Sequence, residues 1–247
     1  MKRELEGRVA LVTGALGAVG SSIAIRLLEE GATVIAAFRG EIARFESLRS
    51  RTTGAIHPWI IDIADDACVQ GAIADIIRTF SRIDILVNNA GVNESLPFAM
   101  MDDAAWNRVV DTNLTGVKRM CAAVAGPMMS QRAGSIINLS SALATVLGRG
   151  SAAYAASKAA LERFTEVAAV ELGRKGIRVN AVAPGLLDGG MGIDMHPNAE
   201  AMALDRTPLG RKGTLAEVAE AVLFLATSRS SFVTGHILAV DGGLTCG

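Results

Sequence analysis

The sequence predicts a single α/β domain of the Rossmann type, a doubly wound parallel sheet of about seven strands with helices on both faces. Two observations predict this fold. Short apolar runs rich in Val and Ile alternate with helical stretches along the chain, which is typical of successive βαβ units. Polar or glycine-rich segments follow these runs, as they do where ligands bind at the carboxyl ends of parallel strands. We take residues 1–247 as one domain, because this length suits one α/β core better than two small ones.

The first expected strand and helix are joined by a glycine-rich turn. Residues 8–13 form a short apolar run that predicts a buried strand, and residues 21–30 show helical spacing. The connection between them carries Gly14, Gly17 and Gly20. Such a turn presents backbone N–H groups and a helix N-terminus to a pyrophosphate, so it predicts dinucleotide binding. A tight turn without a ligand is the alternative.

The end of the second strand bears on the choice of cofactor. Residues 32–38 are apolar throughout, as expected of a central strand buried on both faces, and Arg39 follows them. An acidic residue at this strand end bonds the ribose hydroxyls of NAD, whereas an Arg accommodates a 2′-phosphate. The sequence therefore favours NADP(H), with NAD(H) and a solvated Arg39 as the alternative.

The alternation of strands and helices continues along the chain. We expect further helices at residues 41–51, 65–80, 102–129, 151–172 and 214–226. We expect further strands at residues 55–61, 83–87, 135–141, 177–182 and 236–240. Pro184–Gly185 stops the sixth strand, and residues 186–211, rich in Gly, Met and Pro, predict a mobile lid.

Two strand ends and one expected helix add candidate ligand contacts. Asp62 closes the third strand, where a carboxylate can bond the adenine amino group, and the Asn-Asn-Ala-Gly sequence at 88–91 closes the fourth with small residues that leave room for a ligand. Asn113 and Gly116 lie inside the expected helix 102–129. Because both are poor helix formers, they indicate a functional or strained site.

The proton chemistry is expected at Tyr154 and Lys158. These residues are four apart on the expected helix 151–172, so their side chains share one face. A nearby ammonium lowers the pKa of a phenol and fits it for proton transfer near neutral pH. Tyr154 is also the only tyrosine in the chain. The alternative is a surface pair that shares a helical face by chance.

These residues together resemble the short-chain dehydrogenase/reductase family, in its single-domain form, over essentially the whole chain. The matching motifs are Thr13-Gly14…Gly20, Asp62-Ile63, Asn88-Asn-Ala-Gly91, Asn113, Ser141, Tyr154-x-x-x-Lys158, Pro184-Gly185 and Asp241-Gly-Gly243. In that family the tyrosine is the general acid/base and the serine bonds the substrate oxygen. The lysine lowers the tyrosine pKa and holds the nicotinamide ribose, and the asparagine holds a water in a proton relay.

The resemblance assigns these roles residue by residue. The implied catalytic residues are Tyr154, Lys158, Ser141 and Asn113. Ser140 is the alternative to Ser141, although Ser141 fits the family's interval before the tyrosine. The implied cofactor-binding residues are Gly14, Leu16, Gly17, Val19, Gly20, Arg39, Asp62, Ile63, Asn89, Ala90, Gly91, Tyr154, Lys158, Pro184, Gly185 and Leu187.

Two positions depart from the family pattern. Ala18 stands where single-domain members usually carry glycine, so it adds a methyl where backbone approaches the pyrophosphate. We expect this methyl to lower cofactor affinity without abolishing the site. Gly189 stands where the family often has a threonine that bonds the nicotinamide carboxamide, so that contact is lost or supplied by backbone.

The expected reaction is hydride transfer between a nicotinamide and a carbonyl or secondary alcohol carbon. The chain is similar to 3-oxoacyl-carrier-protein reductases, so a 3-oxoacyl thioester is the expected substrate. The alternatives are a dehydrogenase of a sugar, steroid or ring alcohol and a non-catalytic dinucleotide-binding regulator. Substrate choice is expected to depend on residues 93–98, 142–150 and 186–206. Their apolar side chains are Leu96, Phe98, Leu143, Val146, Leu147, Met191, Ile193, Met195 and Met202.

The composition of the chain limits the partners and the cellular compartment that we expect for it. The net charge is −1 with mixed acids and bases, which predicts neither a nucleic-acid nor a membrane partner. The three dispersed cysteines suit a reducing cytoplasm, and neither they nor His57, His196 and His236 show metal-ligand spacing. The resemblance implies a homotetramer, with an acyl-carrier protein as a candidate partner on Arg132, Arg174 and Lys175. Small residues that permit close helix packing between copies are Ala123, Ala125, Ala155, Ala159 and Ala168.

Overall fold

A computed structural model describes residues 3–40, 42–190 and 197–246. Within these residues a single sheet contains seven strands, all parallel, in the order β3-β2-β1-β4-β5-β6-β7. This confirms the predicted doubly wound parallel sheet. The strands are β1 Val9–Thr13, β2 Thr33–Phe38, β3 Ile56–Ile60, β4 Ile85–Asn88, β5 Gly134–Leu139, β6 Ile177–Pro184 and β7 Ile237–Val240.

The strand order places the functional residues. β1 pairs with β2 on one side and β4 on the other, so the direction in which the chain is wound reverses between β1 and β4. In open parallel sheets a ligand crevice forms outside the carboxyl ends of the strands at such a reversal. The glycine-rich turn follows β1 and the Asn89–Gly91 segment follows β4, so the two segments meet at this point.

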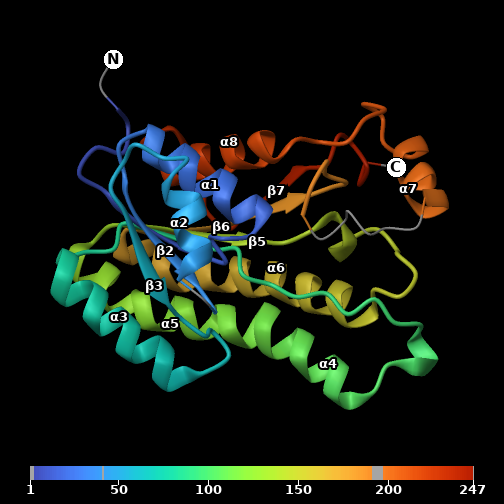
Figure 1. Cartoon of the computed structure of the whole chain (residues 1–247), viewed down its shortest axis with the longest axis horizontal. Coiled ribbons are helices and arrows are strands. Elements are labelled where there is room, and N and C mark those ends of the chain that lie inside the picture. Colours follow the sequence, from blue (N-terminus) through green and yellow to red (C-terminus); the bar gives the residue numbers. More distant parts are fainter. Residues whose placement is uncertain (1–2, 41, 191–196, 247) are drawn as a thin grey trace.

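Helices cover both faces of the sheet (Figure 1). One apolar core lies between the sheet and α1 Ala18–Glu29, α2 Ala43–Arg49 and α8 Leu215–Ala226. The other lies between the sheet and α3 Asp66–Phe80, α5 Val117–Gln131 and α6 Ala152–Leu172. The strands supply Val, Ile and Leu to both cores, which is why they lack strict polar alternation.

Two helices differ from the sequence prediction. α1 begins at Ala18, three residues before the expected start, because Gly17 already serves as its N-cap in extended conformation. The expected helix 102–129 is three consecutive segments, α4 Asp103–Val110, a π-helical turn Asp111–Gly116 and α5. The π-helical turn contains Asn113 and Gly116, so the unfavourable propensities indicated a real irregularity.

The expected lid at 186–211 is described in part. Leu187 bridges Gly213, and α7 spans Pro197–Asp205. The candidate side chains Met191, Ile193 and Met195, together with His196, lie outside the described residues. Among the described residues, no helix has the length and apolarity to cross a bilayer. No group of three or more His, Cys, Asp or Glu side chains in that part of the chain could hold a metal ion.

Candidate active site

Tyr154 and Lys158 are both buried in the first two turns of α6. The ring of Tyr154 packs against a small apolar cluster that includes Val109 and Ala153. Lys158 Nζ lies 5.5 Å from the centre of that ring and donates a 2.6 Å hydrogen bond to the main-chain oxygen of Leu139. The pair therefore points inward, toward the carboxyl end of β5, and the alternative of a chance surface pair is wrong.

The two serines after β5 point to different partners. Ser141 hydrogen-bonds the Tyr154 side chain, and its hydroxyl oxygen also accepts from the N–H of Leu143 at 3.2 Å. Ser140 donates instead to a carboxylate oxygen of Glu162 at 2.7 Å. Of the two candidates, Ser141 is thus the one placed beside the phenol.

Burial dominates the titration of both catalytic candidates. It raises the pKa of Tyr154, and the hydrogen bond with Ser141 opposes this rise. It lowers the pKa of Lys158 from its ordinary value to about 8. The lowering of the Tyr154 pKa by Lys158 therefore stays a prediction, because burial has the larger effect in this arrangement. The ammonium is directed to Leu139, and the loss of water around the phenol has the larger effect.

Asn113 joins the catalytic pair to the dinucleotide side of the site. Its side-chain oxygen accepts from the N–H of Val92 at 2.8 Å, and its amide nitrogen donates to the Val92 oxygen at 2.9 Å and to Ser157 Oγ at 3.2 Å. A Cβ on Gly91 would lie 3.2 Å from Asn113 Oδ1 and 3.7 Å from Lys158 Nζ. The structure thus shows Asn113 as a clamp on the Gly91–Val92 backbone, and its role in a proton relay stays a prediction.

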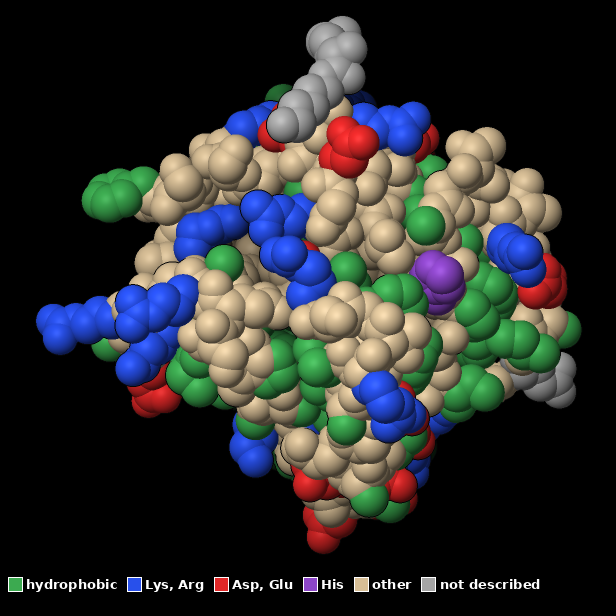
Figure 2. Space-filling model, turned by 90° about the vertical axis from the view of Figure 1, so that its left-hand side faces the viewer, with side chains coloured by type: hydrophobic (Ala, Val, Ile, Leu, Met, Phe, Trp, Pro, Cys, Tyr) green, Lys and Arg blue, Asp and Glu red, His purple; other side chains and the backbone are tan. Residues whose placement is uncertain are grey.

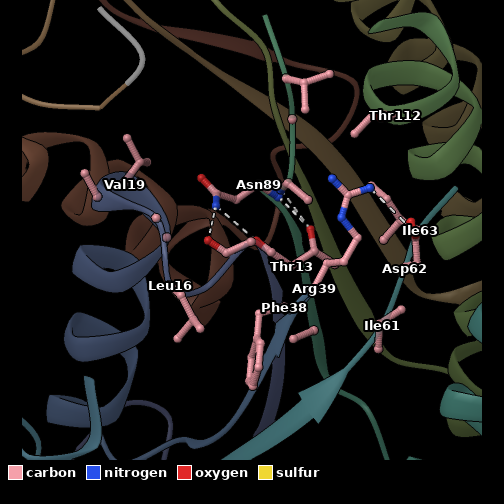
Figure 3. A pocket seen from close by; sticks show the side chains of 18 of the residues that line it. Thr13, Leu16, Val19, Phe38, Arg39, Ile61, Asp62, Ile63, Asn89 and Thr112 are labelled. Carbon is pink, nitrogen blue, oxygen red and sulfur yellow. Dashed lines mark hydrogen bonds and ion pairs between the residues drawn. The ribbon is translucent and has the colours of Figure 1, made fainter. Parts of the chain in front are cut away.

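A pocket of about 340 Å³ lies where β1 to β4 end (Figure 3). Eleven of the sixteen predicted cofactor residues line it: Gly14, Leu16, Gly17, Val19, Gly20, Arg39, Asp62, Ile63, Asn89, Ala90 and Gly91. Ala18 lines it too, as expected of a residue beside the pyrophosphate, and so do Thr13, Phe38, Arg44 and Thr112, which were not predicted as cofactor contacts. Arg44 belongs to no recognised motif. Its position at the start of α2, shortly after Arg39, was the only sequence feature that could have indicated a cofactor contact.

The other five predicted cofactor residues do not line this pocket. Lys158 lies next to its Gly91 wall, and Tyr154 stands one turn before Lys158 on α6. Gly185 packs so closely on the Asp241 backbone that a Cβ would lie 2.7 Å from Asp241 Cα, which explains the Pro184–Gly185 and Asp241 motifs as one packing contact. Leu187 packs into the core beside α8.

The glycine turn is held open by its neighbours. Gly14 has a positive φ of 62°, and a Cβ on Gly20 would overlap the Gly14 oxygen. Asn89 Nδ2 donates to the main-chain oxygens of Thr13 and Gly14 at 3.0 and 3.1 Å (Figure 3). These contacts leave a cradle of bare backbone that fits a pyrophosphate. Ala18, exposed at the start of α1, adds its methyl to the rim.

The adenosine end of the pocket carries charged side chains. Arg39 is 70% exposed and lies 3.6 Å from a carboxylate oxygen of Asp62 (Figure 3). Arg44 lines the same end. Two guanidinium groups against one carboxylate leave an excess of positive charge, which suits a phosphate monoester. The three atoms nearest to a Cβ on Gly189 all belong to the apolar side chain of Leu215, which cannot supply the hydroxyl of the missing threonine.

Comparisons with known proteins agree with this geometry. A family model described as enoyl-(acyl carrier protein) reductase matches residues 14–245. The chain is 39% identical to a 3-oxoacyl-(acyl-carrier-protein) reductase FabG of Thermotoga maritima, over 97% of this chain and 98% of the relative. It is 37% identical to the FabG of Escherichia coli, with the same coverage. A gluconate 5-dehydrogenase from Burkholderia cenocepacia, solved with NADP and tartrate, superposes with a TM-score of 0.94 at 33% identity, over 100% of this chain and 98% of that one.

The parallel sheet, the glycine cradle and the buried tyrosine–lysine pair define an oxidoreductase of the Rossmann class. The chain belongs to the short-chain dehydrogenase/reductase family.

Proposed function

We propose that the protein is an NADP(H)-dependent ketoreductase that reduces the 3-oxo group of an acyl thioester. One observation carries the proposal: the Tyr154 phenol meets the Ser141 hydroxyl, and Lys158 Nζ lies both 5.5 Å from the Tyr154 ring centre and 3.7 Å from where a Cβ on Gly91 of the dinucleotide pocket would stand. A carbonyl oxygen in that place can accept hydrogen bonds from both hydroxyls. The names of the FabG relatives and the NADP complex of the gluconate dehydrogenase support the substrate and the cofactor.

The residues present fit a dinucleotide phosphate. The backbone of Gly14, Gly17 and Gly20 would hold the pyrophosphate, and Arg39 with Arg44 would hold the 2′-phosphate. When bound, the cofactor supplies the hydride. The protein supplies position, proton and exclusion of water.

The proton path follows from the burial of the site. Ser141 orients the carbonyl oxygen, and Tyr154 O–H donates its proton to that oxygen as the alkoxide develops. Lys158, with its pKa lowered to about 8, is close enough to neutrality to exchange protons during turnover. Asn113 keeps the Gly91–Val92 backbone next to Lys158. It therefore fixes the dinucleotide pocket relative to the catalytic residues.

Two of the segments expected to choose the substrate carry exposed apolar side chains, which favour an acyl chain over a polyol. The N–H of Leu96 donates to the Gly150 oxygen at 3.1 Å, so the segments 93–98 and 142–150 are joined beside Tyr154. Beyond the junction Phe98 is 83% and Leu147 is 95% exposed. We propose that these two side chains contact the acyl chain of the substrate. Residues 186–211 would act as a lid over it within a single domain of residues 1–247.

An acyl-carrier protein fits a basic surface at the opposite edge of the sheet. Arg132 precedes β5, while Arg174 and Lys175 precede β6, and a Cβ on Gly176 would overlap the Arg132 oxygen, so the three are neighbours. Figure 2 shows Lys and Arg side chains gathered on this face, the left-hand end of Figure 1. None of the three forms an ion pair with a described residue. A carrier docked there serves the active site of another copy, because Tyr154 lies at the other end of the strands.

Such a copy is supplied by the proposed homotetramer in the cytoplasm. Outward side chains of α6 include Ala159, Val167 and Val170, and Val170 is 81% exposed. Exposed apolar side chains of this kind suit packing against a second subunit. Ala168 was also expected to pack between copies. It is buried in the subunit's own core, so it cannot contact a second subunit. Light scattering measures the assembly.

The decisive experiment is a substrate panel followed by nicotinamide absorbance. Acetoacetyl thioester, crotonyl thioester and gluconate are each offered with NADP(H) and with NAD(H). We expect the highest kcat/KM with acetoacetyl thioester and NADPH. Preference for the crotonyl thioester would indicate enoyl reduction, and preference for gluconate a sugar dehydrogenase; either result overturns the proposal.

A further inference from the structure

Three consecutive residues at the end of β5 are each bonded by a different side chain of α6. The strand end consists of Leu139, Ser140 and Ser141. The side chains that hold it, Tyr154, Lys158 and Glu162, stand four residues apart. Residues at this spacing lie one above the other on a single helical face. The face that carries the tyrosine and the lysine therefore has a third member.

The contact made by Glu162 is short and buried. Ser140 Oγ donates to Glu162 Oε1 at 2.7 Å, and the residue Ser140 is 4% exposed. The main-chain N–H of Ser140 donates to the Val182 oxygen at 2.7 Å. This bond fixes the backbone but leaves the hydroxyl to be satisfied by another group. Within the described residues the hydroxyl has no other partner. Without the carboxylate a buried hydroxyl would be left unpaired, and the strand end would shift to satisfy it.

Glu162 is not half of an ion pair. Lys158, one turn before it on the same face, donates to the Leu139 oxygen instead, and Arg163 pairs with Glu166 at 2.6 Å. Burial and the charge of Glu166 raise the pKa of Glu162, and the hydrogen bond from Ser140 lowers it. No cation pairs with it among the described side chains, so Ser140 is its one polar contact. Glu162 is partly buried and its single polar partner is a hydroxyl. This indicates that its carboxylate serves to bind the Ser140 hydroxyl and not to neutralise a positive charge.

We propose that Glu162 is a positioning residue, which acts through Ser140 to hold the Ser141 hydroxyl against Tyr154. Each residue of the strand end is then bonded by its own side chain of α6. Lys158 binds Leu139, Glu162 binds Ser140 and Tyr154 binds Ser141. This role rests on the proposed function, because Ser141 and Tyr154 are the groups that it serves.

The first test needs no substrate. Tyr154 is the only tyrosine in the chain, so the absorbance of tyrosinate during a pH titration reports on this phenol alone. Ser141 lowers the pKa of Tyr154, so a displaced Ser141 raises the midpoint of the titration. We expect a higher midpoint in Glu162→Ala and in Ser140→Ala. Glu162→Gln keeps an acceptor oxygen and should restore the wild-type midpoint.

Glu166→Ala is the matched control, because it removes a carboxylate one turn further along α6 that does not touch Ser140. It should titrate as wild type. If Glu162→Ala does not fold, Ser140→Ala decides alone. A wild-type midpoint in Ser140→Ala overturns the proposal, and so does a midpoint in Glu162→Gln as high as that in Glu162→Ala.

The second test uses turnover. In Glu162→Ala and Ser140→Ala we expect kcat to fall about tenfold or more, with the Kd for NADPH unchanged, because misplacement of a reacting group costs rate rather than cofactor affinity. A lowered thermal midpoint with unchanged kcat would show a merely structural contact and overturn the role. If the wild type reduces no ketone, the proposed function fails by itself, and the tyrosinate titration still decides the position of Ser141.

Discussion

Lys158 Nζ donates a 2.6 Å hydrogen bond to the main-chain oxygen of Leu139, two residues before Ser141. The bond joins the first turns of α6 to the end of β5. The ammonium is almost wholly out of water in this position, and that burial lowers its pKa to about 8. The same burial that prepares this lysine for proton exchange therefore costs folding free energy.

This cost predicts a pH-dependent stability. Between pH 8 and about 10.5 the unfolded chain keeps the lysine proton that the folded protein has released, so the free energy of unfolding rises with pH. In Lys158→Met that rise is absent. We expect the stability of Lys158→Met relative to wild type to be about 2 kcal/mol more favourable at pH 7 than at pH 9.5. Urea unfolding at the two pH values measures it, and parallel pH profiles would contradict the buried ammonium.

Tyr154→Phe should separate binding from chemistry. The hydroxyl that it removes faces Ser141 and not the dinucleotide pocket. We expect an unchanged Kd for NADPH by fluorescence titration and a kcat lower by about 1,000-fold, the range of a lost general acid. Ser141→Ala is the companion variant and should lose less, because the proton donor remains. Turnover of Tyr154→Phe near the wild-type rate would assign the proton to another group.

The fold and the candidate residues could be read from the sequence because each depends on local pattern. The βαβ alternation, the glycines between β1 and α1 and the four-residue spacing of Tyr154 and Lys158 are all short-range features. What the sequence did not predict depends on tertiary packing. The Ser140–Glu162 bond joins residues 22 apart, and the raised Tyr154 pKa follows from burial by several elements. Arg44 has no motif of its own and enters the pocket only because α2 begins beside it.

Cofactor choice should depend on Arg39 and Arg44 together. Arg39→Asp places a carboxylate beside Asp62, at the end of β2 where a ribose hydroxyl is expected. We expect the ratio of NADPH to NADH affinity to fall by about 100-fold, the worth of one or two charge-assisted hydrogen bonds. Arg44→Ala should lower NADPH affinity and leave NADH affinity unchanged. Isothermal titration measures both, and equal losses for the two cofactors would remove the arginines from the 2′-phosphate.

Asp84 should control stability in acid. Its carboxylate accepts from Arg82 at 2.5 and 2.8 Å, from Arg8 at 2.9 Å and from the N–H of Val9 at 2.9 Å. Burial would raise its pKa, but these bonds outweigh burial and lower it. The stabilisation is therefore present above the ordinary carboxyl pKa and is lost as pH falls through the lowered value. Asp84→Asn should cost about 2 kcal/mol at pH 7 and little in strong acid.

The control for that variant is Asp75→Asn. Asp75 is about half exposed and pairs with Arg78 at 2.6 Å, so the change should alter stability by less than about 0.5 kcal/mol. Urea unfolding from pH 7 to pH 3 compares the two. A similar cost for both variants would mean that burial of Asp84 adds nothing.

The glycine cradle can be tested by two substitutions three residues apart. A Cβ on Gly20 would overlap the Gly14 oxygen and lie 2.6 Å from Asn89 Nδ2, so Gly20→Ala must displace the turn that Asn89 holds. The nearest atom to a Cβ on Gly17 is the Gly14 oxygen at 3.4 Å, an ordinary contact. We expect Gly20→Ala to weaken NADPH binding by about 100-fold or more, at roughly 1.4 kcal/mol for each tenfold loss. Gly17→Ala should lose tenfold at most. Fluorescence titration with thermal melting measures both variants, and equal affinities would show that the pyrophosphate does not depend on this turn.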